Sequence, residues 1–259
     1  IRAGQLHGGG FTMTGISTAV EDFRVMAIPF LFNGYEEVDA VARHMHPYFI
    51  DKFSEQGLEF LALTEVGFIY GMSTTPTASL EDLKKRKSWI PSGDPVSSAY
   101  LDSLGITPIP LTIPDVLSSL QTGLIDTVYN SLDGAIVMQW FNKANYITDA
   151  PFGYAYGVFL MNAKAFKKLS SEQQNIVRES ARTHFSELLE LTRKSNSESR
   201  DVLISQGVQF IKGDPASIEE LAEHREKTVA DQTGKAFSKE AYEILNSTLN
   251  EHRGTGTSK

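Results

Sequence analysis

The chain has 259 residues, enough for one large domain or two smaller lobes. Hydrophobic residues make up 41% and charged residues 22%, and this ordinary globular composition excludes a disordered or fibrous protein. The formal net charge is −8 and no basic face gathers beyond residues 84–87, so we expect no nucleic-acid partner. Cysteine is absent, which excludes disulfides and cysteine nucleophiles and suits an exported protein.

Apolar spacing and cap residues predict alternating strands and helices. Residues 1–4 are typical of the end of a helix that begins upstream, so we expect an N-terminal strand and helix to be missing from these 259 residues. A short strand follows over residues 11–13, then a helix over Tyr35–Gln56 and a buried strand over Leu58–Thr64. Further on, we expect helices over 80–87, 96–104 and 114–122 and strands over 88–91, 106–111 and 124–129. This alternation favours parallel sheets with crossover helices.

The longest predicted helix covers residues 170–206. Ser170 and Gln173 form a capping box at its start. Such a helix is roughly 55 Å long, which exceeds a single small lobe, so we expect it to span two lobes. A strand over 208–211, helices over 215–233 and 239–253, and a flexible tail over 254–259 complete the chain.

Motifs of cofactor, metal and hydrolytic chemistry are weak or missing. The chain has neither G-x-G-x-x-G nor G-K-[ST], and His44 and His46 point to different helix faces, so we expect no cofactor and no metal. Ser17 lies in a segment that resembles a nucleophile elbow, but the available histidines fall inside predicted helices. A hydrolase-like enzyme that uses Ser17, or a Glu65–Asp133 carboxylate pair, is the alternative to a binding protein.

Aromatic residues gather where a ligand pocket could form. They are expected at strand ends and in junction loops, although core and interlobe packing is the better explanation for any single one of them: Phe68, Tyr70, Trp89, Tyr129, Trp140, Phe152, Tyr154 and Tyr156. The polar candidates nearby are Glu65, Asn130, Ser131, Asp133 and Gln139. An aromatic pocket with a few polar groups is typical of a small-molecule site.

Several ordered motifs resemble the periplasmic solute-binding proteins of TRAP transporters, the DctP family. Pro29–Phe32 matches the family's PFLF segment, and Leu80–Lys84 resembles its EDLKG linker. Ile109–Leu111 with Val116–Asp126 resembles its P-x-P and LQ-G-x-x-D segments, and Asn162–Gln174 resembles the entry to its long helix. The resemblance covers nearly the whole chain.

The resemblance implies an α/β, two-lobed periplasmic-binding-protein-like fold with a long helix bridging the lobes. It implies a periplasmic location after removal of a signal peptide, a TRAP membrane permease as partner, and a missing N-terminal strand–helix–strand portion of about 50 residues. We assign residues 1–68 and 157–180 to lobe I, 69–156 and 208–253 to lobe II, and 170–206 to the interlobe helix. A ligand sensor for a membrane receptor would use the same closure.

Departures from the family pattern bear on the ligand. Trp89 stands where the family has the arginine that holds a substrate carboxylate, Ile69 replaces a second frequent arginine, and His7 replaces an aspartate, whereas Asn130 matches the pocket asparagine. We therefore expect a neutral or cationic ligand stacked on Trp89, and loss of binding but not of the fold in Trp89→Ala. The predicted ligand-binding residues are Trp89, Asn130, Glu65, Phe68, Tyr129, Asp133, Tyr154, Tyr156 and Gln139.

Overall fold

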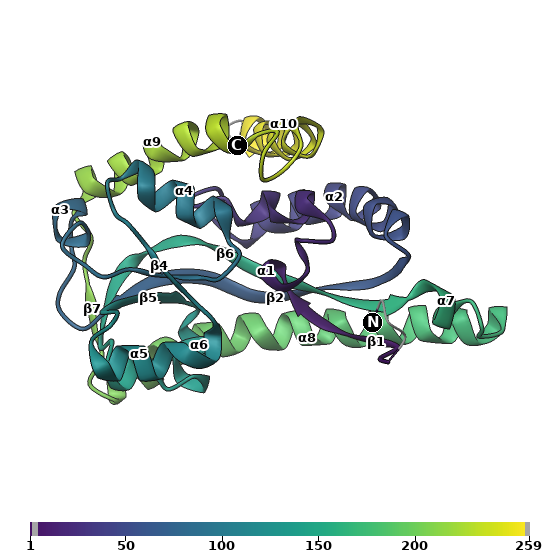
Figure 1. Ribbon diagram of the computed structural model, residues 1–259, viewed down its shortest axis with the longest axis horizontal. Coiled ribbons are helices and arrows are strands. Elements are labelled where there is room, and N and C mark those ends of the chain that lie inside the picture. The colour runs from purple at the N-terminus through teal and green to yellow at the C-terminus, as the bar shows by residue number, and fades with distance from the viewer. Residues whose placement is uncertain (2–4, 257–259) are drawn as a thin grey trace.

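The structure of the chain, a computed structural model, describes residue 1 and residues 5–256. Its strands are β1 (Gly8–Thr12), β2 (Leu58–Ser73), β3 (Trp89–Pro91), β4 (Ile109–Leu111), β5 (Thr127–Asn130), β6 (Tyr146–Asn162) and β7 (Gln209–Ile211). Its α-helices are α1 (Met13–Ile16), α2 (Tyr35–Glu55), α3 (Leu80–Leu83), α4 (Pro95–Ser103), α5 (Val116–Thr122), α6 (Leu132–Val137), α7 (Ala163–Phe166), α8 (Ser171–Ser205), α9 (Pro215–Gln232) and α10 (Lys239–Gly256). Three 3-10 helices are η1 (Glu21–Ala27), η2 (Ile113–Asp115) and η3 (Trp140–Asn142). Figure 1 shows helices on both sides of the main sheet, with α2, α4, α9 and α10 on one side and α5, α6 and α8 on the other.

Two long strands dominate the main sheet. Strands β2 and β6, of 16 and 17 residues, pair antiparallel from Leu58↔Asn162 to Ser73↔Tyr146. The sheet order is β1-β6-β2-β5, with β7 added to β6. Among the named strand pairs only β3–β4 and β6–β7 are parallel, so the expectation of mainly parallel sheets is wrong. The reason is that two uninterrupted strands run along the molecule in opposite directions and pair with each other.

Helix α8 joins the two ends of the molecule, as expected. Ser170 accepts a hydrogen bond from the Gln173 N–H, and the Gln173 side chain accepts one from the Ser170 N–H, which fixes the start of the helix. Its 35 residues extend about 52 Å. Near the start of the helix, Arg178 forms an ion pair with Glu59 on β2 at 2.7 Å. Near its end, Leu203 is fully buried in the hydrophobic cluster that contains Trp89 and Trp140.

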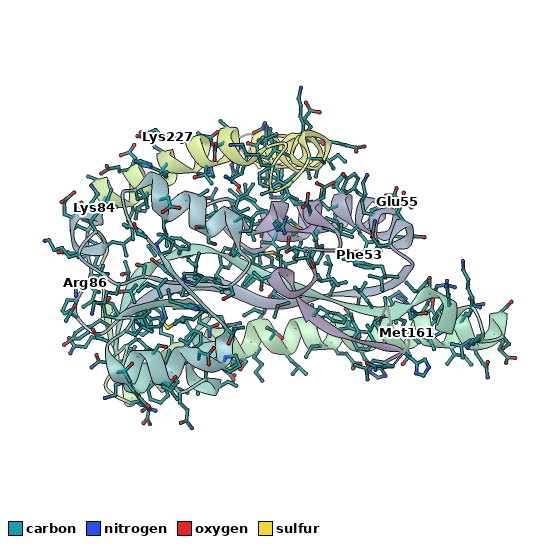
Figure 2. The ribbon with its side chains drawn as sticks, viewed as in Figure 1. Phe53, Glu55, Lys84, Arg86, Met161 and Lys227 are labelled. Atoms are coloured by element: carbon teal, nitrogen blue, oxygen red, sulfur yellow. The ribbon has the colours of Figure 1, made fainter. Side chains whose placement is uncertain are left out.

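The apolar core is divided into separate clusters. The first gathers around Phe23, Phe49 and Phe53 between η1, α2, β6 and α10, and the second surrounds Trp89 and Trp140 between β3, α5, β5 and α6. A third cluster fills the space between α3, α4 and α9. In Figure 2, Phe53 points toward the sheet from α2, whereas charged side chains such as Lys84, Arg86 and Lys227 lie at the periphery. A divided core is what two lobes require.

Both ends of the chain include residues outside the described part. The expected helix end over residues 2–4 lies outside the described residues. Helix α10 ends at Gly256, so residues 254–256 of the expected tail are helical and residues 257–259 lie outside the described part. No helix in the described ranges has an apolar stretch long enough to cross a bilayer. The lobe boundaries stay a prediction.

Candidate functional site

A cavity of about 430 Å³ lies between the two lobes. Its lining comes from β1 and α1, from the crossing strands β2 and β6, and from β3, β5 and α6 on the far side. Aromatic and aliphatic side chains form most of the wall, and the polar residues are Thr12, Thr14, Glu65, Asp94, Ser97, Asn130, Ser131, Asp133 and Thr192. Tyr129, Tyr154 and Tyr156 also line the cavity, but their hydroxyls bond to Ser88, Glu65 and the Phe23 carbonyl, respectively. None of the described residues that line it is lysine, arginine or histidine.

The wall of the cavity around Trp89 is part of a hydrophobic core. Trp89, on β3, is 3% exposed and packs edge-to-face on Trp140 with ring centroids 5.2 Å apart. Its indole N–H donates to the Leu111 carbonyl at 3.1 Å. That N–H is therefore not available to a solute, and a core side chain occupies the position at which the resemblance implies an arginine.

Asn130 presents an uncharged donor at the end of β5. Its Oδ1 accepts a hydrogen bond from the Ser131 N–H at 2.9 Å, which leaves the Nδ2 group as the end that can serve a solute. Gly134 makes room for this side chain, because a Cβ there would lie 2.3 Å from Asn130 Oδ1. The amide can thus donate to a carboxylate, carbonyl or hydroxyl oxygen in the cavity.

The opposite wall contains an ion pair that reaches outside the cavity. The Glu65 side chain, 1% exposed, accepts hydrogen bonds from Arg193 Nη2 at 2.9 Å and from the Tyr154 hydroxyl at 2.8 Å. Arg193 also binds Asp39 at 2.6 Å. The negative charge of Glu65 is therefore already balanced by Arg193, and the Glu65 carboxylate is not an unpaired anion that could bind a cationic solute.

Two aspartates complete the polar lining. Asp133 accepts a hydrogen bond from the Ser195 hydroxyl at 2.6 Å. Asp94 caps α4 by accepting from the N–H and the hydroxyl of Ser97, and burial raises the pKa of its carboxyl against these hydrogen bonds. Burial likewise raises the pKa of Tyr129 to about 12, so its hydroxyl stays protonated at neutral pH.

The cavity brings together seven of the nine predicted site residues: Trp89, Asn130, Glu65, Tyr129, Asp133, Tyr154 and Tyr156. The other two do not line it. Phe68 packs against Tyr35 with ring centroids 4.9 Å apart, on the side of lobe I. Gln139 is exposed at a positive φ of 56°, between the lining residues Met138 and Trp140. Aromatic packing and a turn, respectively, account for their positions.

Sequence reasoning missed the residues of α8 that hold the wall. Arg193, Ser195 and Asn196 contact Glu65, Asp133 and Val66. Polar residues in the middle of a long helix look like an ordinary solvated face, so no local signal marks them. The contacts depend on pairings with residues more than 60 positions away in the chain.

A hydrolytic site is not assembled around Ser17. Its side chain is fully buried, and its hydroxyl lies 3.5 Å from the Thr14 carbonyl. His184 pairs with Glu187 on α8, and His224 lies beside Ser103. Within the described ranges, no group of three or more His, Cys, Asp or Glu side chains could hold a metal ion.

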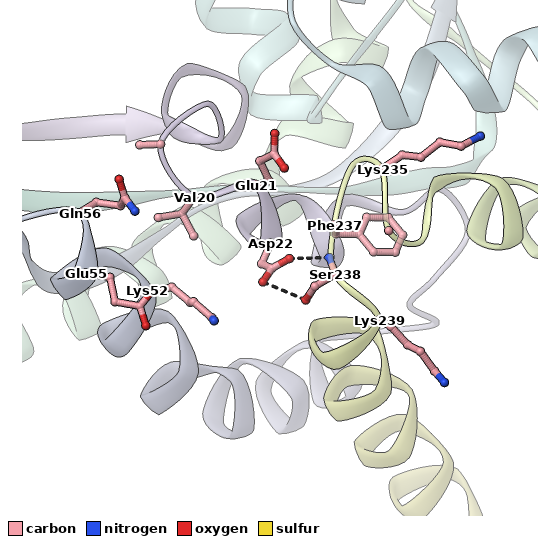
Figure 3. A pocket seen from close by; sticks show the side chains of 12 residues that line it. Val20, Glu21, Asp22, Lys52, Glu55, Gln56, Lys235, Phe237, Ser238 and Lys239 are labelled. Carbon is pink, nitrogen blue, oxygen red and sulfur yellow. Dashed lines mark hydrogen bonds between the residues drawn. The ribbon is translucent and has the colours of Figure 1, made fainter.

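A second cavity, of about 450 Å³, lies where η1, α2 and the turn before α10 meet (Figure 3). Asp22 accepts hydrogen bonds there from the N–H and hydroxyl of Ser238. The three lysines that line it all have carboxylate partners: Lys235 pairs with Asp231, Lys239 with Glu243 and Lys52 with Glu240. Its polar groups thus stabilise the protein itself, and the interlobe cavity is the better candidate site.

Comparisons with known proteins agree with this architecture. Residues 1–235 match the family of bacterial extracellular solute-binding proteins, family 7 (DctP). The chain belongs to this family. Membership confirms the resemblance seen in the motifs, and the family is described as one of solute-binding proteins.

Individual relatives are distant and longer. A solute-binding protein of Roseobacter denitrificans is 27% identical over 204 residues, 76% of this chain and 61% of the relative. The C4-dicarboxylate-binding protein DctP of Rhodobacter capsulatus is 25% identical over 154 residues, 59% of this chain and 46% of the relative. The chain therefore spans less than two thirds of the length of these relatives.

A solved structure establishes the fold class. The TRAP periplasmic solute-binding protein of Xanthobacter autotrophicus, with bound β-D-galacturonate, has a TM-score of 0.88 at 21% identity and covers 96% of this chain and 82% of its own. A Shewanella oneidensis counterpart with bound succinate has a TM-score of 0.86 at 17% identity, over 95% and 81%. The two-lobed fold is confirmed. Both solutes are carboxylates, which contradicts our preference for a neutral or cationic ligand.

Proposed function

We propose that this chain captures a small organic acid in the interlobe cavity and delivers it to a TRAP-type membrane permease. The observation that carries the proposal is the cavity itself, which lies between two lobes and combines an aromatic wall with a few convergent polar groups. Family membership and the carboxylates bound by similar structures support the same function. Closure of the lobes about the crossing strands and α8 would enclose the solute.

The carboxylate is held by neutral donors in this proposal. An arginine is missing at position 89, and the Asn130 Nδ2 group is the best-placed uncharged donor in the wall. Thr12 and Thr14, at the end of β1 and the start of α1, line the same cavity. Asp133, as an acceptor, favours solutes that also carry hydroxyl or N–H groups.

A thermal-unfolding screen tests the proposal with matched pairs of compounds. Galacturonate is compared with galactose and succinate with succinamide, so that each pair differs chiefly in charge. A bound acid at 100 times its Kd stabilises the folded state by about 2.7 kcal/mol, which shifts the melting temperature by several degrees. We expect one or both acids to stabilise the protein and their neutral partners to do so less. Stabilisation by neither acid, or by neutral partners alone, contradicts the proposal.

The variant Asn130→Asp tests whether the Asn130 amide binds the carboxylate of the solute. The change keeps the size of the side chain, removes the Nδ2 donor and adds a negative charge, so binding of the acid should be lost. Asn142→Asp, outside the cavity lining, is the control and should leave the affinity unchanged. Equal affinities of the Asn130→Asp variant and the unmodified chain would place the carboxylate elsewhere.

A further inference from the structure

One turn of α8 holds cavity residues without lining the cavity itself. Ser195 donates from its hydroxyl to the Asp133 carboxylate at 2.6 Å, and Asn196 Oδ1 accepts the Asp133 backbone N–H at 3.2 Å. Neither side chain lines the cavity, whereas Asp133 and the neighbouring Thr192 do. Asp133 is thus bound at two points, at its carboxylate and at its backbone, by consecutive residues of one helix. We call Ser195 and Asn196 the α8 clamp.

The clamp also reaches the crossing strand at an irregular point. Strand β2 pairs Glu65 with Tyr156 and Gly67 with Ala155, so Val66 is an extra residue with no partner on β6. The Val66 carbonyl accepts a hydrogen bond from Asn196 Nδ2 at 2.9 Å. One amide therefore binds the bulge of β2 on one side and the start of α6 on the other.

The backbone next to the bulge is shaped for this contact. Gly67 has a φ of 108°, a conformation that residues with a side chain rarely adopt. A Cβ at this position would lie 2.7 Å from Asn196 Nδ2 and 3.1 Å from the Tyr35 hydroxyl. The glycine thus lets the amide approach β2 closely. Figure 1 shows α8 running below β2 and beside α6, where such a contact can join the lobes.

We propose that Ser195 and Asn196 are positioning residues of the solute site, which fix the Asp133 carboxylate relative to β2. The proposal rests on the proposed function, because it assigns Asp133 a hydrogen bond from the solute. Bonds to both the backbone and the carboxylate of Asp133 remove its rotational freedom before the solute arrives. The chemistry of an aspartate held in this way suits solutes with hydroxyl groups, which donate to its second oxygen.

Galacturonate and succinate serve as probes, because only galacturonate has hydroxyl groups. By titration calorimetry we expect Asn196→Ala to weaken galacturonate binding about tenfold. Succinate binding should change less than twofold by the same reasoning. Asn175→Ala replaces an exposed asparagine near the start of the same helix and should change neither affinity. A merely structural defect would weaken both acids alike and would overturn the proposal.

A double-mutant cycle tests whether the clamp acts through Asp133. In an Asp133→Ala background, Asn196→Ala should weaken galacturonate binding less than twofold further, because the carboxylate that it positions is gone. Additive losses would overturn the proposal. Ser195→Ala removes only one hydroxyl and gives the same cycle if Asn196→Ala does not fold.

The two proposals fail in different ways. If the unmodified chain binds neither acid, the proposed function fails. If the chain binds galacturonate and no clamp variant weakens that binding, this inference alone fails.

Discussion

The two walls of the interlobe cavity are built in different ways. The wall around Trp89 on β3 is a piece of hydrophobic core, in which Trp89 and Trp140 are 3% and 2% exposed and pack on each other. The wall around Glu65 on β2 is polar, and Glu65 owes its position to Arg193 on α8 and to Tyr154 on β6. A substitution in the first wall therefore changes the stability of the fold as well as the site. The second wall depends on a few hydrogen bonds and one ion pair.

The largest expected effect breaks the core wall. Trp89→Ala should lower the free energy of unfolding by about 3–5 kcal/mol, because it opens a cavity beside Trp140 and removes a hydrogen bond to Leu111. The burial of Trp89 thus leads to a different prediction from the sequence, from which we expected the variant to keep its fold intact. Urea unfolding measures the change. A loss below about 1 kcal/mol would show that the side chain belongs to the ligand site and not to the core.

A smaller effect is expected when the polar wall is broken. Arg193→Met leaves the Glu65 carboxylate, whose side chain is 1% exposed, without its cation, and should cost about 3 kcal/mol of unfolding free energy. Arg182→Met, on the same helix, removes an arginine whose ion pair with Glu179 is exposed, and should leave stability unchanged. Equal urea midpoints for the two variants would contradict the role given to the Arg193–Glu65 pair.

The mildest effect concerns an ion pair away from both walls. Burial disfavours the charged form of Glu37, but hydrogen bonds from Arg253 and Asn33 prevail and lower its pKa from 4.5 to about 2. A carboxyl with a lowered pKa in the folded state stabilises the fold above pH 4.5, and this stability is lost as the pH falls toward 2. The difference in melting temperature between the unmodified chain and Glu37→Gln should therefore shrink over that range. A constant difference would contradict the assignment.

The contrast between the walls also explains what the sequence could predict. The capping box of Ser170 and Gln173 forms as expected, because it depends only on residues three positions apart. The strand over 58–64 was predicted too short, since its continuation to Ser73 is stabilised by pairing with β6, about 80 residues later.

The polar wall had no comparable signal. Arg193 and Asn196 look like surface residues of a helix until α8 is placed against β2, and their partners Glu65 and Val66 lie about 130 positions earlier. The antiparallel pairing of β2 and β6 was missed for the same reason, because alternation of strands and helices along the chain says little about which long strands meet.

Intrinsic tryptophan fluorescence tests the central claim, that the acid binds between the lobes. The chain has two tryptophans, and both Trp89 and Trp140 line the interlobe cavity. Titration with galacturonate should give a saturable change in emission that disappears in Asn130→Asp. Stabilisation of the protein by galacturonate without any change in emission, or with the same change in Asn130→Asp, would place the acid outside this site and contradict the account.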